Sequence, residues 1–252
     1  MPWTERQEAL LQGLGLRLWS PSAPVSADPV PAAPPPAVAS LVAPAAAAPP
    51  PAAAGAGPLD WPALRQAVAG CRACGLCEGR TQTVFGTGHP QAHWLLVGEA
   101  PGEQEDLQGL PFVGAAGQLL DRMLAALGLT RAEDGPQPPA QRVYNANALK
   151  CRPPRNRNPT AQEMASCAPY LQRQIELLQP RLILALGRFA VQALLHSDEP
   201  IGKLRGRVHH HAGVPLIVSY HPAYLLRSPL EKAKAWEDLC LAAGVAEAGA
   251  AP

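Results

Sequence analysis

The sequence lacks the features that mark membrane and secreted proteins. It contains no run of 18 apolar residues, so no segment is long enough to cross a bilayer as a helix. Its N-terminus has no basic region followed by an apolar stretch, which a secretory signal would require. We therefore expect a cytoplasmic protein that is not attached to a membrane. In that reducing compartment, the six cysteines are expected to be metal ligands or free thiols rather than disulfides.

The sequence also has no strong excess of charge of one sign. Its formal net charge is +1, which says little about partners when taken over the whole chain. Basic residues do gather in two places, which are Lys150, Arg152, Arg155 and Arg157, and then Lys203, Arg205 and Arg207. Each cluster is interpreted either as a solvated face or as a surface that contacts a polyanion.

Residues 21–57 have very few large apolar side chains. Of these 37 residues, 26 are proline or alanine, and Asp28 carries the only charge. Such a stretch cannot bury enough surface to offset the entropy of ordering itself, so we expect a disordered, semi-rigid linker. The linker separates residues 1–20 from one folded domain, expected over 58–245. Residues 246–252 are expected to form a disordered tail.

The segment before the linker has its own apolar pattern. Leucines between Trp3 and Trp19 fall on a short, partly amphipathic helix, which Gly13 and Gly15 weaken. One interpretation is a frayed terminal segment. The other is a docking peptide, residues 3–19, which the linker tethers to a partner protein.

The domain alternates short apolar runs with helical patterns. The runs predict buried strands at residues 94–97, 143–149, 182–186 and 216–219. Helices are predicted at residues 61–69, 115–127, 160–178, 188–195 and 229–243. This alternation predicts an α/β fold in which helices cover both faces of a parallel sheet. Ligand sites in such sheets lie beyond the carboxyl ends of the strands.

Four cysteines form a grouping typical of a metal centre. Cys71 and Cys74 make a CxxC at the end of the first predicted helix, and Cys151 and Cys167 flank the basic loop at 152–160. Four thiolates suit either tetrahedral zinc or an iron–sulfur cluster, and the spacing does not separate the two. Unligated core cysteines are the third interpretation. Cys77 makes a second CxxC with Cys74 and competes as a ligand. Cys240 is expected to be a packed thiol.

Several loops that follow the predicted strands carry chemically useful residues. Phe112 lies in a loop framed by glycine and proline, where it is either a stacking platform or a core residue. Asn147 is an amide among apolar residues, so it must pair with the backbone or with a planar ligand. His221 ends the last predicted strand and is followed by Pro222 and by a Leu-Leu-Arg turn. A histidine in that setting favours a functional role over a structural one.

Taken together, these segments resemble family 4 uracil-DNA glycosylases, which are bacterial and archaeal enzymes with a 4Fe–4S cluster. The resemblance is carried by CRAC at 71–74, GEAPGEQED at 98–106, GLPFVGAAG at 109–117, NALKCRPP at 147–154 and HPAYLLRSP at 221–229. It covers roughly residues 61–239 in the family's order and leaves the first 57 residues outside. It implies a three-layer α/β/α domain with a central four-stranded parallel sheet. It also implies a DNA-repair enzyme that flips uracil out of single- or double-stranded DNA and hydrolyses its N-glycosidic bond.

The resemblance also implies a role for each matching residue. The implied 4Fe–4S ligands are Cys71, Cys74, Cys151 and Cys167. The implied uracil-binding residues are Glu99 and Ala100 through their backbone, Phe112 by stacking, Asn147 through its amide, and His221, which would stabilise charge on the departing base. The implied DNA contacts are Lys150, Arg152, Arg155, Asn156 and Arg157 to phosphates, and the wedge Leu225, Leu226 and Arg227.

The resemblance does not identify the residue that activates the water. The best-known uracil glycosylases have an aspartate where this chain has Ala100. Glu105, and after it Glu99, are the candidates to assist. We expect a monomer that works beside the nucleoid.

Two other functions remain open. A variant of the superfamily bonds covalently to its DNA product through a histidine in a basic loop, and this chain has His209, His210 and His211 in that region. The first motif, however, has Ala100 rather than the glutamine of that variant. The second alternative is a non-catalytic or polymerase-associated DNA-binding module that retains the fold.

Overall fold

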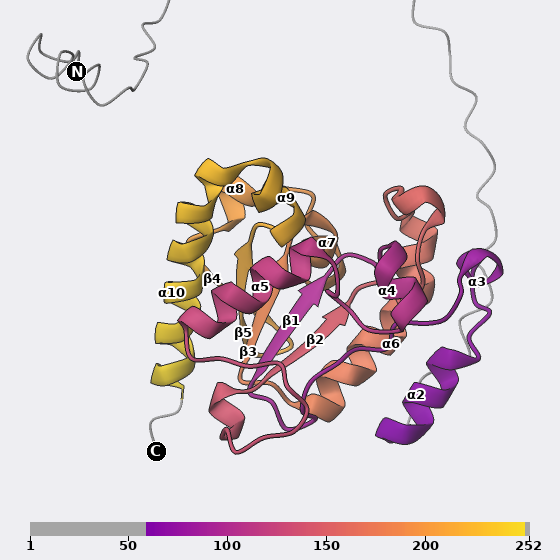
Figure 1. The fold of residues 1–252 in the computed structure, drawn as a ribbon, viewed down its shortest axis with the longest axis horizontal. Coiled ribbons are helices and arrows are strands. Elements are labelled where there is room, and N and C mark those ends of the chain that lie inside the picture. Colours follow the sequence, from indigo (N-terminus) through magenta and orange to yellow (C-terminus); the bar gives the residue numbers. More distant parts are fainter. Residues whose placement is uncertain (1–58, 250–252) are drawn as a thin grey trace, which may run out of the picture. The chain divides into compact units, whose positions relative to one another are not determined.

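The computed structural model describes residues 59–249 (Figure 1). The predicted N-terminal helix and docking segment at 1–20 and the predicted linker at 21–57 lie outside the described residues. Helix α10 continues to Ala248, three residues beyond the domain boundary expected at residue 245. No helix within residues 59–249 is long and apolar enough to cross a membrane.

The predicted parallel sheet is confirmed. Its strands are β1 (Trp94–Gly98), β2 (Val143–Asn147), β3 (Leu182–Leu186), β4 (Val208–His211) and β5 (Val214–Ser219), in the order β2-β1-β3-β5-β4. The four strands expected from the sequence pair in parallel, whereas β4 adds an antiparallel edge beside β5. The sequence did not predict β4, because its alternately exposed side chains do not form an apolar run.

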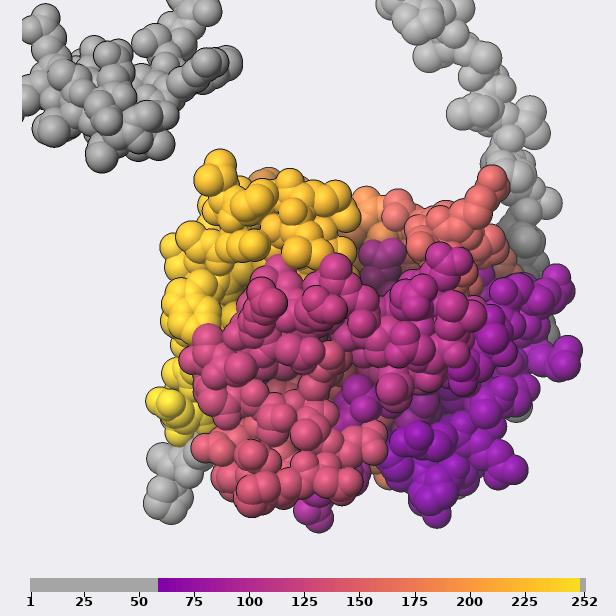
Figure 2. Space-filling view, viewed as in Figure 1, coloured from indigo at the N-terminus to yellow at the C-terminus, as the bar shows by residue number. Residues whose placement is uncertain are grey.

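Helices cover both faces of the sheet, as expected. On one face, strand residues pack with Leu171 and Ile175 of α6 (Ala161–Leu178) and with Val191 of α7 (Arg188–Leu195). On the other face they pack with Leu120 of α5 (Ala115–Ala126) and Leu239 of α10 (Lys232–Ala248). Figure 1 shows α5 crossing in front of the strands. In the same view, Figure 2 shows the side chains of α4, α5 and the segment before β2 hiding the sheet.

Short elements complete the domain. They are α2 (Trp61–Ala69), α3 (Leu76–Gly79), α4 (Glu103–Gln108), η1 (Pro139–Gln141), η2 (Pro154–Asn156), α8 (Ile201–Leu204), α9 (Pro222–Arg227) and η3 (Pro229–Glu231). Helix α6 begins as the sequence predicted, because Thr160 and Glu163 form a capping box. Cys240, in contrast, is exposed on α10 rather than packed in the core.

The carboxyl ends of the parallel strands bring the functional loops to one edge. Gly98 at the end of β1 pairs with Asn147 at the end of β2, and Leu186 of β3 pairs with Ser219 of β5. The segments that follow these strand ends therefore lie side by side.

Candidate active site and cysteine centre

Two of the predicted base-binding side chains lie close to Gly98. Asn147, on the neighbouring strand, is only 4% exposed, and its Oδ1 lies directly over Gly98. The ring of Phe112 approaches the same position, so that a Cβ built on Gly98 would be 2.7 Å from its Cζ. Any larger residue at position 98 would displace the amide or the ring. The absence of a side chain at Gly98 therefore leaves room for both Asn147 and Phe112.

The Phe112 loop is held in a conformation that a phenylalanine rarely adopts. Phe112 has φ 56°, in the left-handed region. Arg131 donates to the carbonyl oxygens of Pro111 at 3.1 Å and Phe112 at 2.9 Å, and Asp121 pairs with Arg131 at 2.5 Å. Gly117 lets α5 approach the Phe112 carbonyl so closely that no Cβ would fit. Neither Arg131 nor Asp121 was predicted, because their sequence context carries no local signal.

Glu105 supports the same loop from α4. Its Oε1 accepts hydrogen bonds from the backbone N–H of Val113 at 3.1 Å and Gly114 at 3.4 Å. The negative charge of Glu105 also acts on His221. Glu105 therefore stabilises the backbone just before the first residue of α5.

His221 is the N-cap of α9, and this fixes its tautomer. The backbone N–H of Ala223 donates to His221 Nδ1 at 3.2 Å, so in the neutral ring the proton is on Nε2. Burial, together with the charge of Arg227, lowers the pKa of His221 to about 4, while the charge of Glu105 acts in the opposite direction. The imidazole is stacked on Phe112, with 5.7 Å between ring centroids and 26° between planes. At neutral pH, His221 is therefore an uncharged hydrogen-bond donor.

Glu99 and Ala100 follow β1 at the same edge. Burial raises the pKa of the Glu99 carboxyl, while the charge of Arg188 acts in the opposite direction. The Glu99 carbonyl accepts from the N–H of Leu149 at 3.0 Å, which joins this loop to the segment after β2. Ala100 packs against the cluster that contains Cys151. The loop thus lies between the pocket and the cysteines.

The structure brings the four predicted ligand cysteines together. Cys71, Cys74, Cys151 and Cys167 line one small pocket, and Cys77 lines it as well. Burial raises the pKa of Cys74, of Cys151 and of Cys167, the last to about 12. Among residues 59–249, no three His, Cys, Asp or Glu side chains are arranged to hold a single metal ion.

Two basic residues contact this cysteine group, Arg80 through its side chain and Lys150 through its backbone. Arg80 Nη1 donates to Cys151 Sγ at 3.1 Å, and the backbone N–H of Lys150 donates to Cys167 Sγ at 3.3 Å. Lys150 is 1% exposed, and its Nζ donates to the Asn147 carbonyl at 2.8 Å and to Gln174 Oε1 at 2.6 Å. A buried ammonium is unfavourable without negative charge nearby. Thiolates bound to a metal or cluster at these cysteines would supply negative charge near both cations.

Burial does not favour two of the predicted DNA contacts. The ammonium of Lys150 is buried and bonded to Asn147 and Gln174. Leu225 is fully buried beside α5. The motif gives the order of residues along the chain but not the direction of each side chain.

The other predicted DNA contacts lie at the surface. Arg155 is exposed, as are Leu226, at 43%, and Arg227. Arg152 Nε donates to Asn156 Oδ1 at 2.7 Å, which shapes the basic loop. Arg157 is exposed but pairs with Glu163 at 2.5 Å, and this pairing lowers the pKa of Glu163 to about 2.

The histidines of the second basic segment lie elsewhere. They are on β4, whose residues 208–211 pair with the part of β5 that precedes its carboxyl end. His209 Nε2 is 2.7 Å from the Leu204 carbonyl oxygen, and His211 Nδ1 is 2.8 Å from that of Leu194. These contacts give His209 and His211 a structural role and do not favour covalent capture of DNA.

The fold and the site define an α/β protein that gathers Asn147, Phe112 and His221 at the carboxyl edge of its sheet, beside a group of cysteines. A model of the Uracil DNA glycosylase superfamily matches residues 85–240. The chain belongs to this superfamily, and the predicted family, fold class and enzyme class are confirmed.

Individual relatives agree with this assignment. A type-4 uracil-DNA glycosylase of Archaeoglobus fulgidus is 43% identical over 170 residues, which cover 64% of this chain and 81% of the relative. One from Pyrobaculum aerophilum is 39% identical over 191 residues, covering 73% and 93%. A type-5 uracil-DNA glycosylase of Thermus thermophilus is 35% identical over 150 residues, covering 55% and 68%.

Proposed function

We propose that this chain excises uracil from DNA through a pocket formed by Asn147, Phe112 and His221, beside a 4Fe–4S cluster on Cys71, Cys74, Cys151 and Cys167. The main observation in support is the tautomer of His221, whose Nδ1 is occupied by the Ala223 N–H and whose Nε2 is left to donate. A neutral donor suits a reaction in which negative charge grows on a departing base.

Base recognition is assigned to Asn147. Its amide offers one donor and one acceptor side, which match the adjacent carbonyl and N–H at one edge of uracil. Cytosine presents the reversed pattern at the corresponding position, so it would leave both amide groups unpaired. Lys150 bonds to the carbonyl of Asn147 and so fixes the backbone from which this amide projects.

Phe112 provides the surface on which the extruded ring stacks. Stacked bases lie about 3.4 Å apart, so a base between two parallel rings would hold them about 7 Å apart. Phe112 and His221 are 5.7 Å apart. The base therefore does not fit between the two rings at this distance. We assign the stacking role to Phe112 and the donation from Nε2–H to a uracil oxygen to His221.

Bond cleavage needs a water molecule at C1′ of the sugar. The C1′–N1 bond breaks, its electron pair goes to the uracil ring, and the water oxygen forms the new bond to C1′ and loses a proton. Glu99 is suited to accept that proton, because burial raises the pKa of its carboxyl. Glu105 is assigned a supporting role, since its Oε1 already accepts from Val113 and Gly114.

The cysteine pocket fits an iron–sulfur cluster. Cys71, Cys74, Cys151 and Cys167 line it together, Arg80 donates to Cys151, and the backbone N–H of Lys150 donates to Cys167. When bound, the cluster supplies a cross-link between the segment after α2, the segment after β2, and α6. This cross-link holds the basic loop at 152–160 at the edge of the pocket.

The DNA face is assigned to that loop and to α9. Arg152, Arg155, Asn156 and Arg157 would contact phosphates, and Leu226 with Arg227 would fill the gap left by the extruded base. Both segments border the pocket. Such a substrate would place the protein with the nucleoid, and a monomer suffices for every role assigned here.

An excision assay on a uracil-containing oligonucleotide tests this function. The cluster-loaded protein is incubated with single-stranded and duplex substrates, and abasic sites are cleaved with alkali. Wild type should yield cut strands, while Asn147→Ala should be slower by about 100-fold or more. Gln172→Ala, an exposed amide on α6, serves as the matched control and should cut at the wild-type rate. Uncut strands with the wild-type protein would refute the proposal, and a protein band shifted on a denaturing gel would indicate covalent capture instead.

A further inference from the structure

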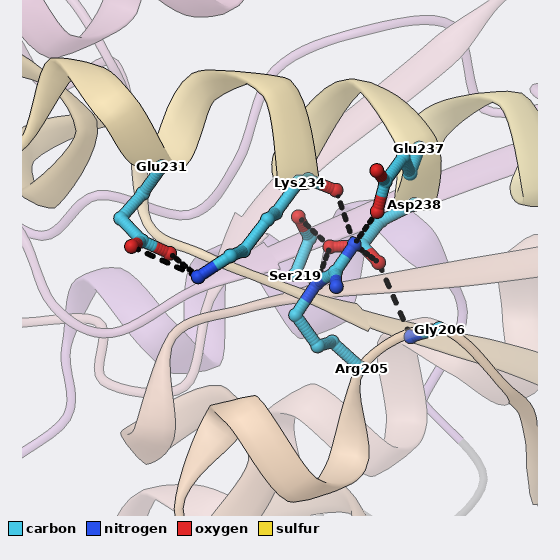
Figure 3. A network of polar contacts seen from close by, with 7 residues as sticks. All are labelled: Arg205, Gly206, Ser219, Glu231, Lys234, Glu237 and Asp238. Carbon is cyan, nitrogen blue, oxygen red and sulfur yellow. Dashed lines mark hydrogen bonds and ion pairs between the residues drawn. The ribbon is translucent and has the colours of Figure 1, made fainter. Parts of the chain in front are cut away.

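A buried carboxylate lies under the strand that leads to His221. Asp238 of α10 is fully buried, and it accepts hydrogen bonds from Ser219 Oγ at 2.8 Å, Arg205 Nε at 3.1 Å and the Gly206 N–H at 3.2 Å (Figure 3). These groups come from the end of β5 and from the segment between α8 and β4. The Asp238 side chain therefore links α10 to the end of β5 and to the segment between α8 and β4.

Arg205 extends this network to the surface of α10. Its Nη2 donates to the Lys234 carbonyl at 2.5 Å and to Glu237 Oε2 at 2.9 Å, while its side chain stays 14% exposed. The guanidinium thus spans the first turns of α10 (Figure 3). Although Arg205 belongs to the second basic cluster of the sequence, its charge is used inside the protein rather than toward a polyanion.

The network reaches the pocket through Ser219. Ser219 is the last residue of β5, two positions before His221, and its carbonyl accepts from the Gly187 N–H at 2.9 Å. Gly187 has φ 87°, and a Cβ built on it would be 3.1 Å from Cβ of His221. The backbone that carries His221 is therefore held on one side by the Ser219–Asp238 bond and on the other by Gly187.

This arrangement is not needed for stability alone. A buried ion pair gains little over well-packed apolar side chains of similar size, because both charges must leave water. A satisfied polar network does impose one fixed geometry. His221 needs such a geometry, because a shift of about 1 Å in a reacting group can cost about 100-fold in rate.

We propose that Asp238, acting through Ser219 with Arg205 as its counter-ion, is a positioning residue that sets the placement of His221 for glycosidic bond cleavage. The inference rests on the role of His221 given under the proposed function. Asp238 touches neither DNA nor base, and its effect is on kcat rather than on substrate binding.

Kinetics of two network variants test this proposal. Asp238→Asn keeps the size of the side chain but removes its charge, and Ser219→Ala removes a single bond while leaving the Arg205–Asp238 pair intact. In the holoenzyme, below the unfolding temperature of each variant, both should lower kcat by about 10- to 100-fold and leave KM within about twofold. Glu237→Gln is the matched control on the same helix, because its carboxylate also contacts Arg205 but is 68% exposed. It should retain the wild-type kcat.

A double-mutant cycle separates positioning from general destabilisation. If Ser219 acts through His221, adding Ser219→Ala to His221→Ala should cause no further loss of kcat. Additive losses, or a Ser219→Ala protein with wild-type kcat, would overturn the proposal. If His221→Ala alone leaves excision unchanged, the role proposed for His221 is wrong. This result differs from the two outcomes that would overturn the role of Asp238. Nuclear magnetic resonance of the imidazole gives a second readout, since the His221 signals should shift in Ser219→Ala and not in Glu237→Gln.

Discussion

Phe112 and His221 face each other with 5.7 Å between their ring centroids, although one follows β1 and the other follows β5. The two rings come together because the parallel sheet brings both strand ends to the same edge. Hydrogen bonds that involve the backbone hold each ring in place. Phe112 is held by Arg131, and His221 by the Ala223 N–H.

The first prediction concerns the protonation of His221. Because burial lowers its pKa from 6.5 to about 4, the ring should stay neutral, with the proton on Nε2, from pH 7 down to about 5. Between pH 6.5 and 4 the unfolded chain binds the proton more readily than the folded one, so the free energy of unfolding should decrease as pH falls through this window. A nitrogen-15 titration of the imidazole measures this directly. A titration midpoint near 6.5 would contradict the buried, N-capping geometry.

The second prediction separates two roles for Glu105. If Glu105 supports the Phe112 loop through the Val113 and Gly114 N–H groups, Glu105→Gln retains an acceptor oxygen and should keep kcat within about threefold. Glu105→Ala should lose about tenfold or more, because two partly buried donors lose their partner. Excision rates on one oligonucleotide compare the two variants. Equal, large losses in both would instead assign proton transfer to Glu105.

The third prediction concerns the basic residues next to the pocket. Arg155 is exposed, so Arg155→Gln should weaken DNA binding and reduce the slope of log K against log salt by about 1. Lys150 is buried, so Lys150→Met should leave that slope unchanged but impair excision by releasing the Asn147 carbonyl. Fluorescence anisotropy over a range of salt concentrations measures both slopes. A reduced slope for Lys150→Met would show that its ammonium reaches phosphate after all.

The fourth prediction concerns the cofactor. Protein purified without oxygen should be brown and contain about four iron atoms per chain. Cys74→Ser should lose most of this colour and iron, whereas Cys240→Ser, at an exposed thiol far along α10, should keep both. Cys77→Ser should also keep them, since Cys77 is not among the four proposed ligands. A colourless wild-type protein that contains zinc would refute the cluster.

The sequence predicted which residues form the site but not how they are arranged. Asn147 and Phe112 could be selected because a polar amide in an apolar strand and a ring in a polar loop are both unusual. The sequence could not show that Gly98 lets them meet, since this depends on the pairing of β1 with β2. It likewise assigned Lys150 to DNA, because a lysine beside arginines in a loop is normally solvated.

Other residues were missed because their partners are far away along the chain. Asp238 bonds to Ser219 and to Arg205, which lie 19 and 33 positions before it. One weak signal was available: Ser219 is a hydroxyl at the end of an otherwise apolar strand, and a buried hydroxyl must find a partner. Nothing local to Asp238 indicates which partner it finds.

Patterns along the chain were enough to predict the four parallel strands, the start of α6, the functional edge of the sheet and most candidate residues. These follow from apolar periodicity, capping and motif spacing, which are properties of neighbours along the chain. The burial of Lys150 and Leu225, the burial that keeps His221 neutral, and the position of Asp238 beneath its strand became visible in the folded domain alone. Burial and hydrogen-bond partners depend on contacts between segments distant in sequence, and those contacts exist only once the sheet has formed.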